Sequence, residues 1–462
     1  MTQMAIRPTV SGPIAGGSKG WPFAASMLDL ASYGYTEAEY FLEGTATRYR
    51  LADGTELTRD GKWSAVPAGE APFRTRMLVY RPSDPAKFNG TVIVTWNNVT
   101  AGYDLFSAES LELLEGGFGL VCLTVQKVGI EGLPPVHQGL ANWDPERYGT
   151  LSIPSDDYSY DILTQCARAV GRDRSRQPVD PMGGLEVKHV VAQGGSQSAG
   201  RLATYVNAIQ PLTRAFDGFI LTIYFGTGAA LEVGETVVNI NAMPQDGSSS
   251  RRLRGTNLLR DDLGVPIFVV NSELEAIACY DVRQPDTDTF RYWESAGTCH
   301  VSAQGQRDRQ VKHQRDQLVT APLAQGINRI PMIPLYDAAF HHMHRWLSEG
   351  VPPPSQPKVE FAGDPPEVVR DEHGIAKGGI RLPQAEVPLA QNSAIPLSPD
   401  IFAFLGGSCH PFSKEKAHAL YGSKEAFLAK FEAAAQRAVE AGVLMPRDVP
   451  GLVAEAAGDW PE

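Results

Sequence analysis

One stretch near the middle of the chain constrains its fold more than any other: EVKHVVAQGGSQSAGRLATYVN, from Glu186 to Asn207. Residues 187–192 are nearly all apolar or β-branched, which is typical of a strand buried on both faces. After a short run of glycine and serine, apolar residues recur at a spacing that places them on one face of a helix. A strand that passes through a tight Gly/Ser turn directly into a helix indicates a layered α/β protein.

The Gly/Ser turn carries two candidate nucleophiles, because its pattern can be phased in two ways. In the phasing G-x-S-x-S the central residue is Ser196, and in S-x-S-x-G it is Ser198. We favour Ser196, because glycine follows the strand directly there and the helical spacing starts sooner. A serine in such a turn projects above the sheet, and the backbone N–H of Gln197 beside it, at a helix N-terminus, would stabilise a developing oxyanion. The structural alternative is a serine that only caps the helix.

Composition and charge exclude several classes of protein. Hydrophobic residues make up 43% of the 462 residues and charged residues 20%, as in globular proteins with a large core. A formal net charge of −12 argues against nucleic acid or an anionic membrane as a partner. No apolar run is long enough to span a membrane, and residues 1–19 lack a secretory signal pattern, so we expect a cytoplasmic location. No cofactor is expected, and the oligomeric state stays open.

Strand and helix patterns alternate along the chain and predict its architecture. The early strands, 34–50 and 75–81, resemble an antiparallel edge. The later strands are expected at 90–96, 119–125, 187–192, 218–224, 266–271 and 290–294, and helices at 106–115, 157–170, 333–349, 420–442 and 452–457. Apolar strands separated by helices predict a mostly parallel central sheet flanked by helices. In such a sheet the functional site lies at the carboxyl ends of the strands.

Shifts in composition predict three parts. Residues 1–70 form an N-terminal extension with edge strands, 71–349 the α/β core, and 350–462 a C-terminal helical appendage packed on the core, reached through the Pro-rich stretch GVPPPSQPK. Within the core, residues 225–264 form a polar insert that would serve as a lid over the site. A solvated loop is the alternative for this insert.

An acid and a histidine follow two later strands. Glu273 and Glu275 come after the strand that ends at 270, and His300 comes after the strand that ends near 293. The order serine, acid, histidine at three strand ends is that of a hydrolase triad, in which histidine takes the serine proton and the carboxylate orients the imidazole. Counting from the strand end favours Glu275 as the acid, and Glu273 stays open as the alternative.

The neighbouring residues suggest further parts of the site. The second oxyanion donor is expected in the loop after strand 90–96, as the backbone N–H of Asn97 or Asn98, with an ordinary Asn-rich turn as the alternative. Cys279 and Cys299 lie close in sequence to the acid and the histidine, so a disulfide would form between them if the two loops meet; two free thiols are the alternative. No metal site is expected, because cysteine pairs with metal spacing are missing and adjacent histidines in 341–344 diverge on a helix.

Six stretches resemble a bacterial family described only as α/β-hydrolase domain-containing proteins. They are GYTEAEYFLEGTATRYR, KFNGTVIVTWNNVTAG, ERYGTLSIPSDDYSYDI, GGSQSAGRLATYVNAIQP, RQPDTDTFRYWESAGTCH and DEHGIAKGGIRLPQAEVP. The resemblance extends over nearly the whole chain and implies an α/β-hydrolase fold and an esterase-like serine hydrolase. It implies Ser196 as the nucleophile and His300 as the base, with Cys299 where the family usually has a small residue. It gives no firm substrate and does not decide between Glu273 and Glu275.

The sequence therefore predicts a serine hydrolase that cleaves a carboxylic ester of a small molecule. In this prediction Ser196, His300 and Glu275 act as a triad through an acyl-enzyme intermediate. A lactone or thioester substrate is one alternative, and a non-catalytic binding protein on the same fold is another, since a fold does not fix a function.

Overall fold

The computed structural model describes residues 8–105, 110–172, 174, 178–234, 256–320, 322, 324–397 and 401–461, with the side chains of 401–403 left aside. Backbone contacts divide the chain into two compact units, each described by itself. The first unit is Met1–Ile267 with Lys312–Thr320, and the second is Phe268–Val311 with Ala321–Glu462. The three-part division predicted from composition stays a prediction. Most of the predicted lid, residues 235–255, lies outside the described residues.

The first unit is built on a sheet whose strands lie in the order β1-β2-β3-β5-β4-β6-β7. Their bounds are β1 (Thr9–Ser11), β2 (Tyr35–Leu51), β3 (Ala65–Pro82), β4 (Thr91–Trp96), β5 (Gly119–Leu123), β6 (His189–Gly195) and β7 (Gly218–Thr222). The pairs from β1 to β5 are antiparallel, and β5, β4, β6 and β7 pair in parallel. The predicted antiparallel early strands are therefore confirmed. Every residue of β4 and β5 is buried, as their apolar sequences require.

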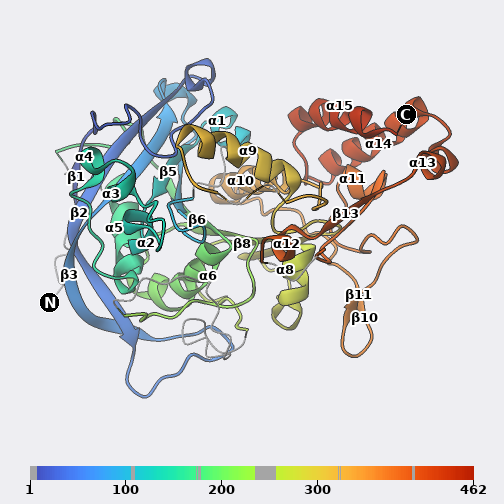
Figure 1. Cartoon of the computed structure of the whole chain (residues 1–462). Coiled ribbons are helices and arrows are strands. Elements are labelled where there is room, and N and C mark those ends of the chain that lie inside the picture. The colour runs from blue at the N-terminus through green and yellow to red at the C-terminus, as the bar shows by residue number, and fades with distance from the viewer. Residues whose placement is uncertain are drawn as a thin grey trace. The chain divides into compact units, whose positions relative to one another are not determined.

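Helices cover this sheet. They are α1 (Leu111–Glu115), α2 (Lys127–Glu131), α3 (Leu140–Trp143), α4 (Pro145–Tyr148), α5 (Ser159–Val170), α6 (Gln197–Thr204) and α7 (Gln210–Thr213), with a π-helical turn at Tyr205–Ile209 between the last two. Figure 1 shows α5 and α6 lying against the strands, and α5 is buried along most of its length. Part of the helix predicted at 106–115 is confirmed as α1, while 106–109 lie outside the described residues. The layered α/β prediction is confirmed.

The second unit begins with two neighbouring strands, β8 (Ile267–Ser272, which starts at the last residue of the first unit) and β9 (Phe290–Ser295). The helix α8 (Glu273–Ala278) follows β8 directly, α9 (Ala303–Arg315) begins in the second unit and ends in the first, and α10 (Ile333–Glu349) spans the predicted range. The remaining elements are β10 (Phe361–Ala362), β11 (Glu367–Val368), α11 (Pro383–Glu386), β12 (Ala390–Ser393), α12 (Ile401–Gly406), β13 (Ser408–Pro411), α13 (Lys414–Tyr421), α14 (Lys424–Glu440) and α15 (Val449–Asp459).

The C-terminal residues of the second unit pack on the segments around β8 and β9. Ile380 forms a parallel bridge with Ser295: its N–H donates to Glu294 O at 2.7 Å and its carbonyl accepts from Ala296 N at 2.9 Å. A small apolar cluster joins α8, the loop after β9 and the C-terminal residues. Its buried members are Ala276, Ala296, Val359 and Ala376. The region after residue 350 thus forms part of the surroundings of α8 and of the loop after β9.

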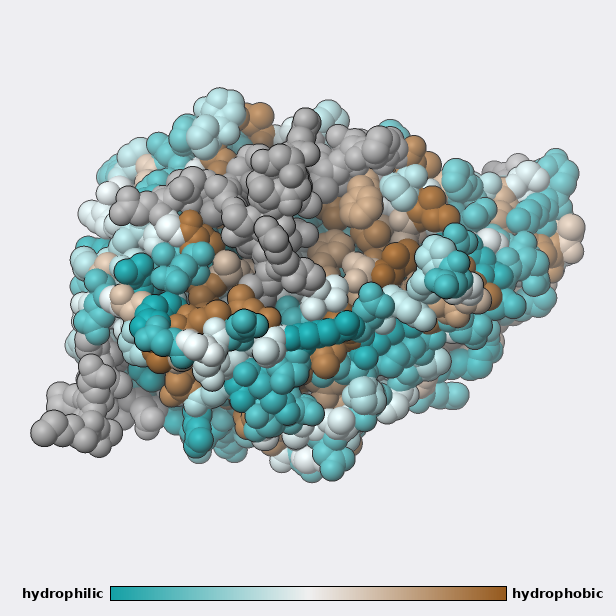
Figure 2. Space-filling model, turned by 90° about the horizontal axis from the view of Figure 1, so that it is seen from below, coloured by the Kyte–Doolittle hydropathy of each residue, from teal (hydrophilic) through white to brown (hydrophobic). Residues whose placement is uncertain are grey.

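The described residues include no helix that is both long and apolar enough to cross a membrane. On the face shown in Figure 2, hydrophilic residues predominate and apolar residues gather in patches.

Candidate active site

The turn between β6 and α6 holds Ser196 in an unusual backbone conformation. Its φ is 61° and its ψ is −121°, a region that residues other than glycine rarely adopt and that costs about 1–3 kcal/mol. Two hydrogen bonds fix the turn: Ser196 N donates to Thr222 O of β7 at 3.0 Å, and Gly200 N donates to Ser196 O at 3.2 Å. The strained residue is the serine that the sequence favours as a nucleophile.

The glycines before Ser196 are required by close packing. A Cβ on Gly194 would lie 3.0 Å from the carbonyl carbon of Ser198, and a Cβ on Gly195 would lie 2.8 Å from Thr222 Oγ1. Side chains at these two positions would push β6 away from its neighbours, so the turn depends on both glycines.

Ser198 occupies a different environment from Ser196. It lies inside α6 with 0% of its surface exposed, and its Oγ has no hydrogen-bond partner among the described residues. Ser196, by contrast, is partly exposed at the turn. The geometry therefore favours Ser196 over Ser198 as a nucleophile.

The loop after β4 distinguishes the two asparagines proposed as oxyanion donors. The backbone N–H of Asn97 donates to Leu123 O at 3.2 Å, so it already has an acceptor in the sheet. Asn98 follows it, and its side chain ties the loop to the serine turn, since Nδ2 donates to Gly195 O at 3.1 Å. The backbone N–H of Gln197 is the first of α6, where intrahelical acceptors are lacking. Gln197 and Asn98 are therefore the better candidate pair of donors.

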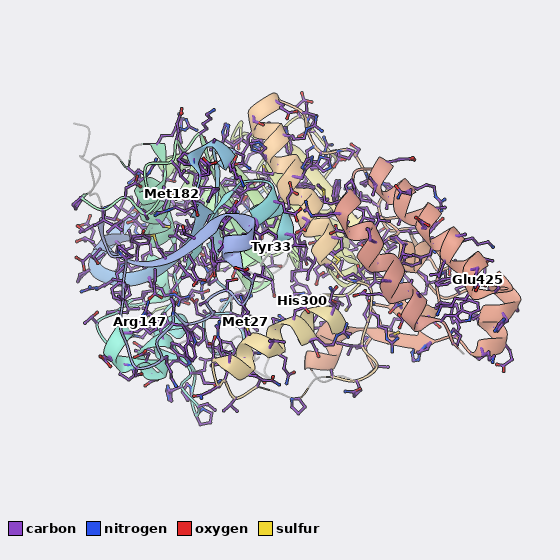
Figure 3. The ribbon with its side chains drawn as sticks, turned by 90° about the horizontal axis from the view of Figure 1, so that it is seen from above. Met27, Tyr33, Arg147, Met182, His300 and Glu425 are labelled. Carbon is purple, nitrogen blue, oxygen red and sulfur yellow. The ribbon has the colours of Figure 1, made fainter. Side chains whose placement is uncertain are left out.

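A buried charge network supports this loop from within the first unit. The Asn97 side chain donates to Asp104 Oδ2 at 2.8 Å, and Asp104 faces the Arg76 guanidinium at 3.7 Å. Burial raises the pKa of Asp104, and Arg76 opposes that rise. Arg76 also pairs with Glu39 at 3.2 Å, and Glu39 pairs with Arg147, labelled in Figure 3, at 2.6 Å. The network anchors the β4 loop to the long hairpin of β2 and β3.

The second unit brings the predicted acid and histidine together. Oε1 of Glu275 lies 2.7 Å from Nδ1 of His300, and both residues are buried. Glu275 sits in the first turn of α8, where its Oε2 also accepts from the backbone and hydroxyl of Ser272 in a capping box. His300 lies between β9 and α9 and is labelled in Figure 3. A carboxylate at Nδ1 is the arrangement that orients an imidazole for proton transfer at its other nitrogen.

Glu273, the alternative acid, has different partners. Its Oε1 accepts from Arg370 Nη2 at 2.6 Å and from Ala394 N at 3.3 Å. Its Oε2 accepts from Gly297 N at 2.9 Å. The structure therefore pairs the histidine with Glu275, a choice that the sequence left open.

The predicted disulfide between Cys279 and Cys299 is wrong. All five cysteines are free and buried. The acid and histidine loops do meet, but each sulfur has another partner: Cys279 Sγ accepts from Asn271 Nδ2 at 3.6 Å, and Cys299 Sγ donates to Leu405 O at 3.1 Å. Burial raises the pKa of Cys279 to about 12.

Sequence reasoning missed two residues that hold the histidine loop, Arg370 and Asn328. Asn328 Nδ2 donates to Gly297 O at 2.7 Å, and its carbonyl accepts from Ala303 N at 2.8 Å. Arg370 pairs with Glu273, which in turn accepts from Gly297 N of the loop. Asn328 and Arg370 lie far along the chain from these partners, and neither belongs to a periodic pattern or a short motif, so no local signal marked them.

The histidines at 341–344 lie on α10. His342 Nε2 is 2.7 Å from Gly442 O. Within the described part of the chain, no group of three or more histidine, cysteine or acidic residues is placed to hold a metal ion.

The parallel strands, the covering helices and the strand–serine–helix turn define an α/β-hydrolase fold. The chain matches the family model described as "Alpha/beta hydrolase domain" over residues 10–454, and it belongs to that family. No curated protein matches the chain.

Several solved structures are similar to the chain at low identity. The structure of esterase Est22 is 11% identical, with 63% of this chain and 80% of that chain covered and a TM-score of 0.31. A glucuronoyl esterase from Solibacter usitatus is 13% identical over 64% of this chain and 81% of its own, with a TM-score of 0.28. Brefeldin A esterase, a bacterial homologue of human hormone sensitive lipase, is 12% identical over 57% and 75%, with a TM-score of 0.25.

Proposed function

We propose that this α/β-hydrolase family member is a serine hydrolase that cleaves a carboxylic ester of a small molecule. The observation that carries the proposal is the conformation of Ser196, a non-glycine residue at φ 61° in the turn between β6 and α6. Strain of this kind persists where the surrounding structure enforces it, and it concentrates at functional sites. The same turn exposes a serine hydroxyl beside a helix N-terminus in enzymes that use a nucleophile elbow.

In the proposed reaction, Ser196 Oγ attacks the carbonyl carbon of the ester while His300 accepts the hydroxyl proton. Glu275 is hydrogen-bonded to Nδ1 of His300 and so keeps the imidazole in the tautomer that presents Nε2 as the base. It also stabilises the imidazolium that forms. The backbone N–H groups of Gln197 and Asn98 stabilise the oxyanion of the tetrahedral intermediate. The C–O bond then breaks, and the leaving alkoxide takes the proton from His300.

The acyl group is now bound to Ser196 through an ester bond. A water molecule attacks this acyl carbon while His300 accepts its proton, and collapse of the second tetrahedral intermediate returns that proton to Ser196 Oγ and releases the carboxylic acid. A lactone or thioester would react by the same steps. With a lactone the alcohol and the acid would remain in one product molecule, and with a thioester the leaving group would be a thiol.

Hydrolysis of p-nitrophenyl acetate and butyrate by the wild type and two serine variants tests the proposal. We expect Ser196→Ala to lower kcat/KM by about 10⁴-fold or more, because removal of a triad nucleophile abolishes the covalent route. Ser198→Ala is the matched control, two residues further along the chain and inside α6, and should keep most of the activity. A fluorophosphonate probe should label the wild type at Ser196.

Other outcomes would contradict the proposal in different ways. Loss of activity in Ser198→Ala alone would move the nucleophile to Ser198. Full activity in both variants would refute a serine triad. A wild-type protein that neither turns over the esters nor reacts with the probe would favour a non-catalytic binding protein on the same fold.

A further inference from the structure

We propose that Arg370, from the C-terminal residues of the second unit, is a positioning residue for the Glu275–His300 pair and acts through Glu273. The inference rests on the proposed function, since only a hydrolase that uses His300 as its base would depend on where that imidazole is held. It assigns a role in the reaction to a region that the sequence predicted to be an appendage.

The first turn of α8 carries two fully buried carboxylates with separate tasks. Glu275 binds His300, while Glu273 binds Arg370, Gly297 and Ala394. A buried carboxylate is costly unless a cation and hydrogen-bond donors compensate it. Among the ion pairs of the described residues, Arg370 is the one basic side chain that pairs with Glu273, at 2.6 Å.

Glu273 connects α8 to the loop that carries the histidine. Its Oε2 accepts from Gly297 N at 2.9 Å, three residues before His300. Gly297 has a φ of 71°, and a Cβ there would lie 3.1 Å from Ile375, so the loop turns sharply at this point. Glu273 therefore fixes the distance between α8 and the histidine loop independently of the hydrogen bond between Glu275 and His300.

The far end of the histidine loop is also held by the C-terminal residues. Val301 N donates to Leu405 O at 2.9 Å, and Cys299 Sγ donates to the same carbonyl at 3.1 Å. His300 lies between these two anchored residues. The loop is thus held on both sides of His300 in the sequence. The contact before it, at Gly297, is the one that involves the Glu273–Arg370 ion pair.

Arg370 is itself presented by an ordered turn. It forms an antiparallel bridge with Ala376, and its Nη1 donates to Gly374 O at 3.2 Å. Ala376 packs with Val359 against Ala276 of α8 and Ala296 of the histidine loop. The guanidinium is therefore placed against Glu273 by the same packing that joins the C-terminal residues to the acid and the histidine.

Loss of the guanidinium would leave Glu273 buried without its cation, an arrangement that the loop can relieve by moving. Movement at Gly297 would shift His300 relative to Glu275. Neither Glu273 nor Arg370 is assigned a contact with substrate, so we expect the catalytic rate to fall while the affinity for substrate changes little. Displacement of about 1 Å in a catalytic group can lower the rate by about 100-fold.

The test compares Arg370→Ala, Arg370→Lys and Arg447→Ala in the full chain. Arg447 is a matched control, because its side chain is 22% exposed, close to 21% for Arg370, and it pairs with the buried Asp337 of α10 in the same unit. For each variant, kcat and KM on p-nitrophenyl butyrate, the melting temperature and the downfield Nδ1 proton resonance of His300 would be measured beside the wild type and Ser196→Ala.

We expect Arg370→Ala to lower kcat by about 10- to 100-fold, with KM changed by less than about 3-fold, and to weaken the His300 resonance. Arg370→Lys should recover most of kcat, because it restores a cation. Arg447→Ala should lower the melting temperature and leave both kcat and the resonance near those of the wild type.

Three results would overturn the inference: an unchanged kcat in Arg370→Ala, an equal loss of kcat in Arg447→Ala, or no recovery in Arg370→Lys. Should Arg370→Ala fail to fold, Glu273→Gln tests the same link with a side chain of nearly the same shape, and an unchanged kcat there overturns the inference too. Ser196→Ala separates the two proposals, because full activity in that variant defeats the proposed function whatever Arg370 does.

Discussion

The serine turn and the Glu275–His300 pair are held in place in contrasting ways. The turn is formed by Ser196 and its immediate neighbours in sequence, with one strand partner, Thr222, and its unusual feature is a backbone angle. The acid–base pair depends on segments that lie more than a hundred residues apart, from α8 to Leu405, and its features are hydrogen bonds and one ion pair. A short local sequence can enforce a strained angle, whereas the placement of an imidazole needs contacts from several parts of the chain.

This difference predicts different consequences of substitution. Around Ser196, a change should act mainly through backbone conformation and close packing. Around His300, a change at a residue remote in sequence should still reach the imidazole, because several segments share the task of holding it.

The largest expected effect is a difference in kcat between variants of the two carboxylates of α8, Glu275 and Glu273. We expect Glu275→Gln to lower kcat by on the order of 10³- to 10⁴-fold, because an amide at Nδ1 no longer selects the tautomer that makes His300 a base. Glu273→Gln should cost only about 10- to 100-fold, since it acts through the loop. The measurement is kcat on p-nitrophenyl butyrate. Equal losses in the two variants would mean that both carboxylates serve His300 alike.

A smaller effect should appear in stability at the serine turn. Ser196→Gly and Ser196→Ala should both be inactive, but the glycine variant should be more stable to urea by about 1 kcal/mol, because glycine adopts a φ of 61° without steric cost. At Ser198, inside α6, the order should be reversed, with glycine less stable than alanine by about 1 kcal/mol. If the alanine variant were the more stable one at both positions, the backbone strain at Ser196 would carry no energetic cost.

The smallest effect should come from the cysteines. Because burial raises the pKa of Cys279 to about 12, its thiol stays protonated at pH 8, and its reactivity should grow only as the pH approaches that value. We expect the folded protein to react slowly with Ellman's reagent at pH 8, and a reductant to leave its melting temperature unchanged. Unfolded without reductant, the protein should show five thiols. A count of three would reveal a disulfide, and a peptide map that joined Cys279 to Cys299 would contradict the purely noncovalent support of the acid–base pair.

The sequence could predict the features that depend on neighbouring residues. The apolar run at 187–192 overlaps β6, the strand that begins at His189 and leads into Ser196, and the helical spacing at 333–349 coincides with α10. Local periodicity and the Gly/Ser run carry this information, because strands and helices repeat over a few residues. The order of serine, acid and histidine also located the two residues that the second unit pairs, Glu275 and His300.

Features that depend on distant contacts could not be predicted in the same way. The sequence did not distinguish Asn97 from Asn98, because the difference lies in a hydrogen bond from Asn97 N to Leu123 in another strand. It left Glu273 open as the acid, because the partner that occupies it, Arg370, comes 97 residues later. The cysteine prediction was wrong for a related reason: proximity of two loops does not determine which way each sulfur points.

The late position of Arg370 and Leu405 also bears on how the protein is made. A chain emerging from the ribosome presents Glu273, Glu275 and His300 well before the residues that neutralise Glu273 and hold the histidine loop. Until those residues arrive, a carboxylate destined for burial has no cation, which disfavours its burial. Nascent chains that already contain all three proposed triad residues should therefore stay catalytically silent until synthesis has passed Leu405.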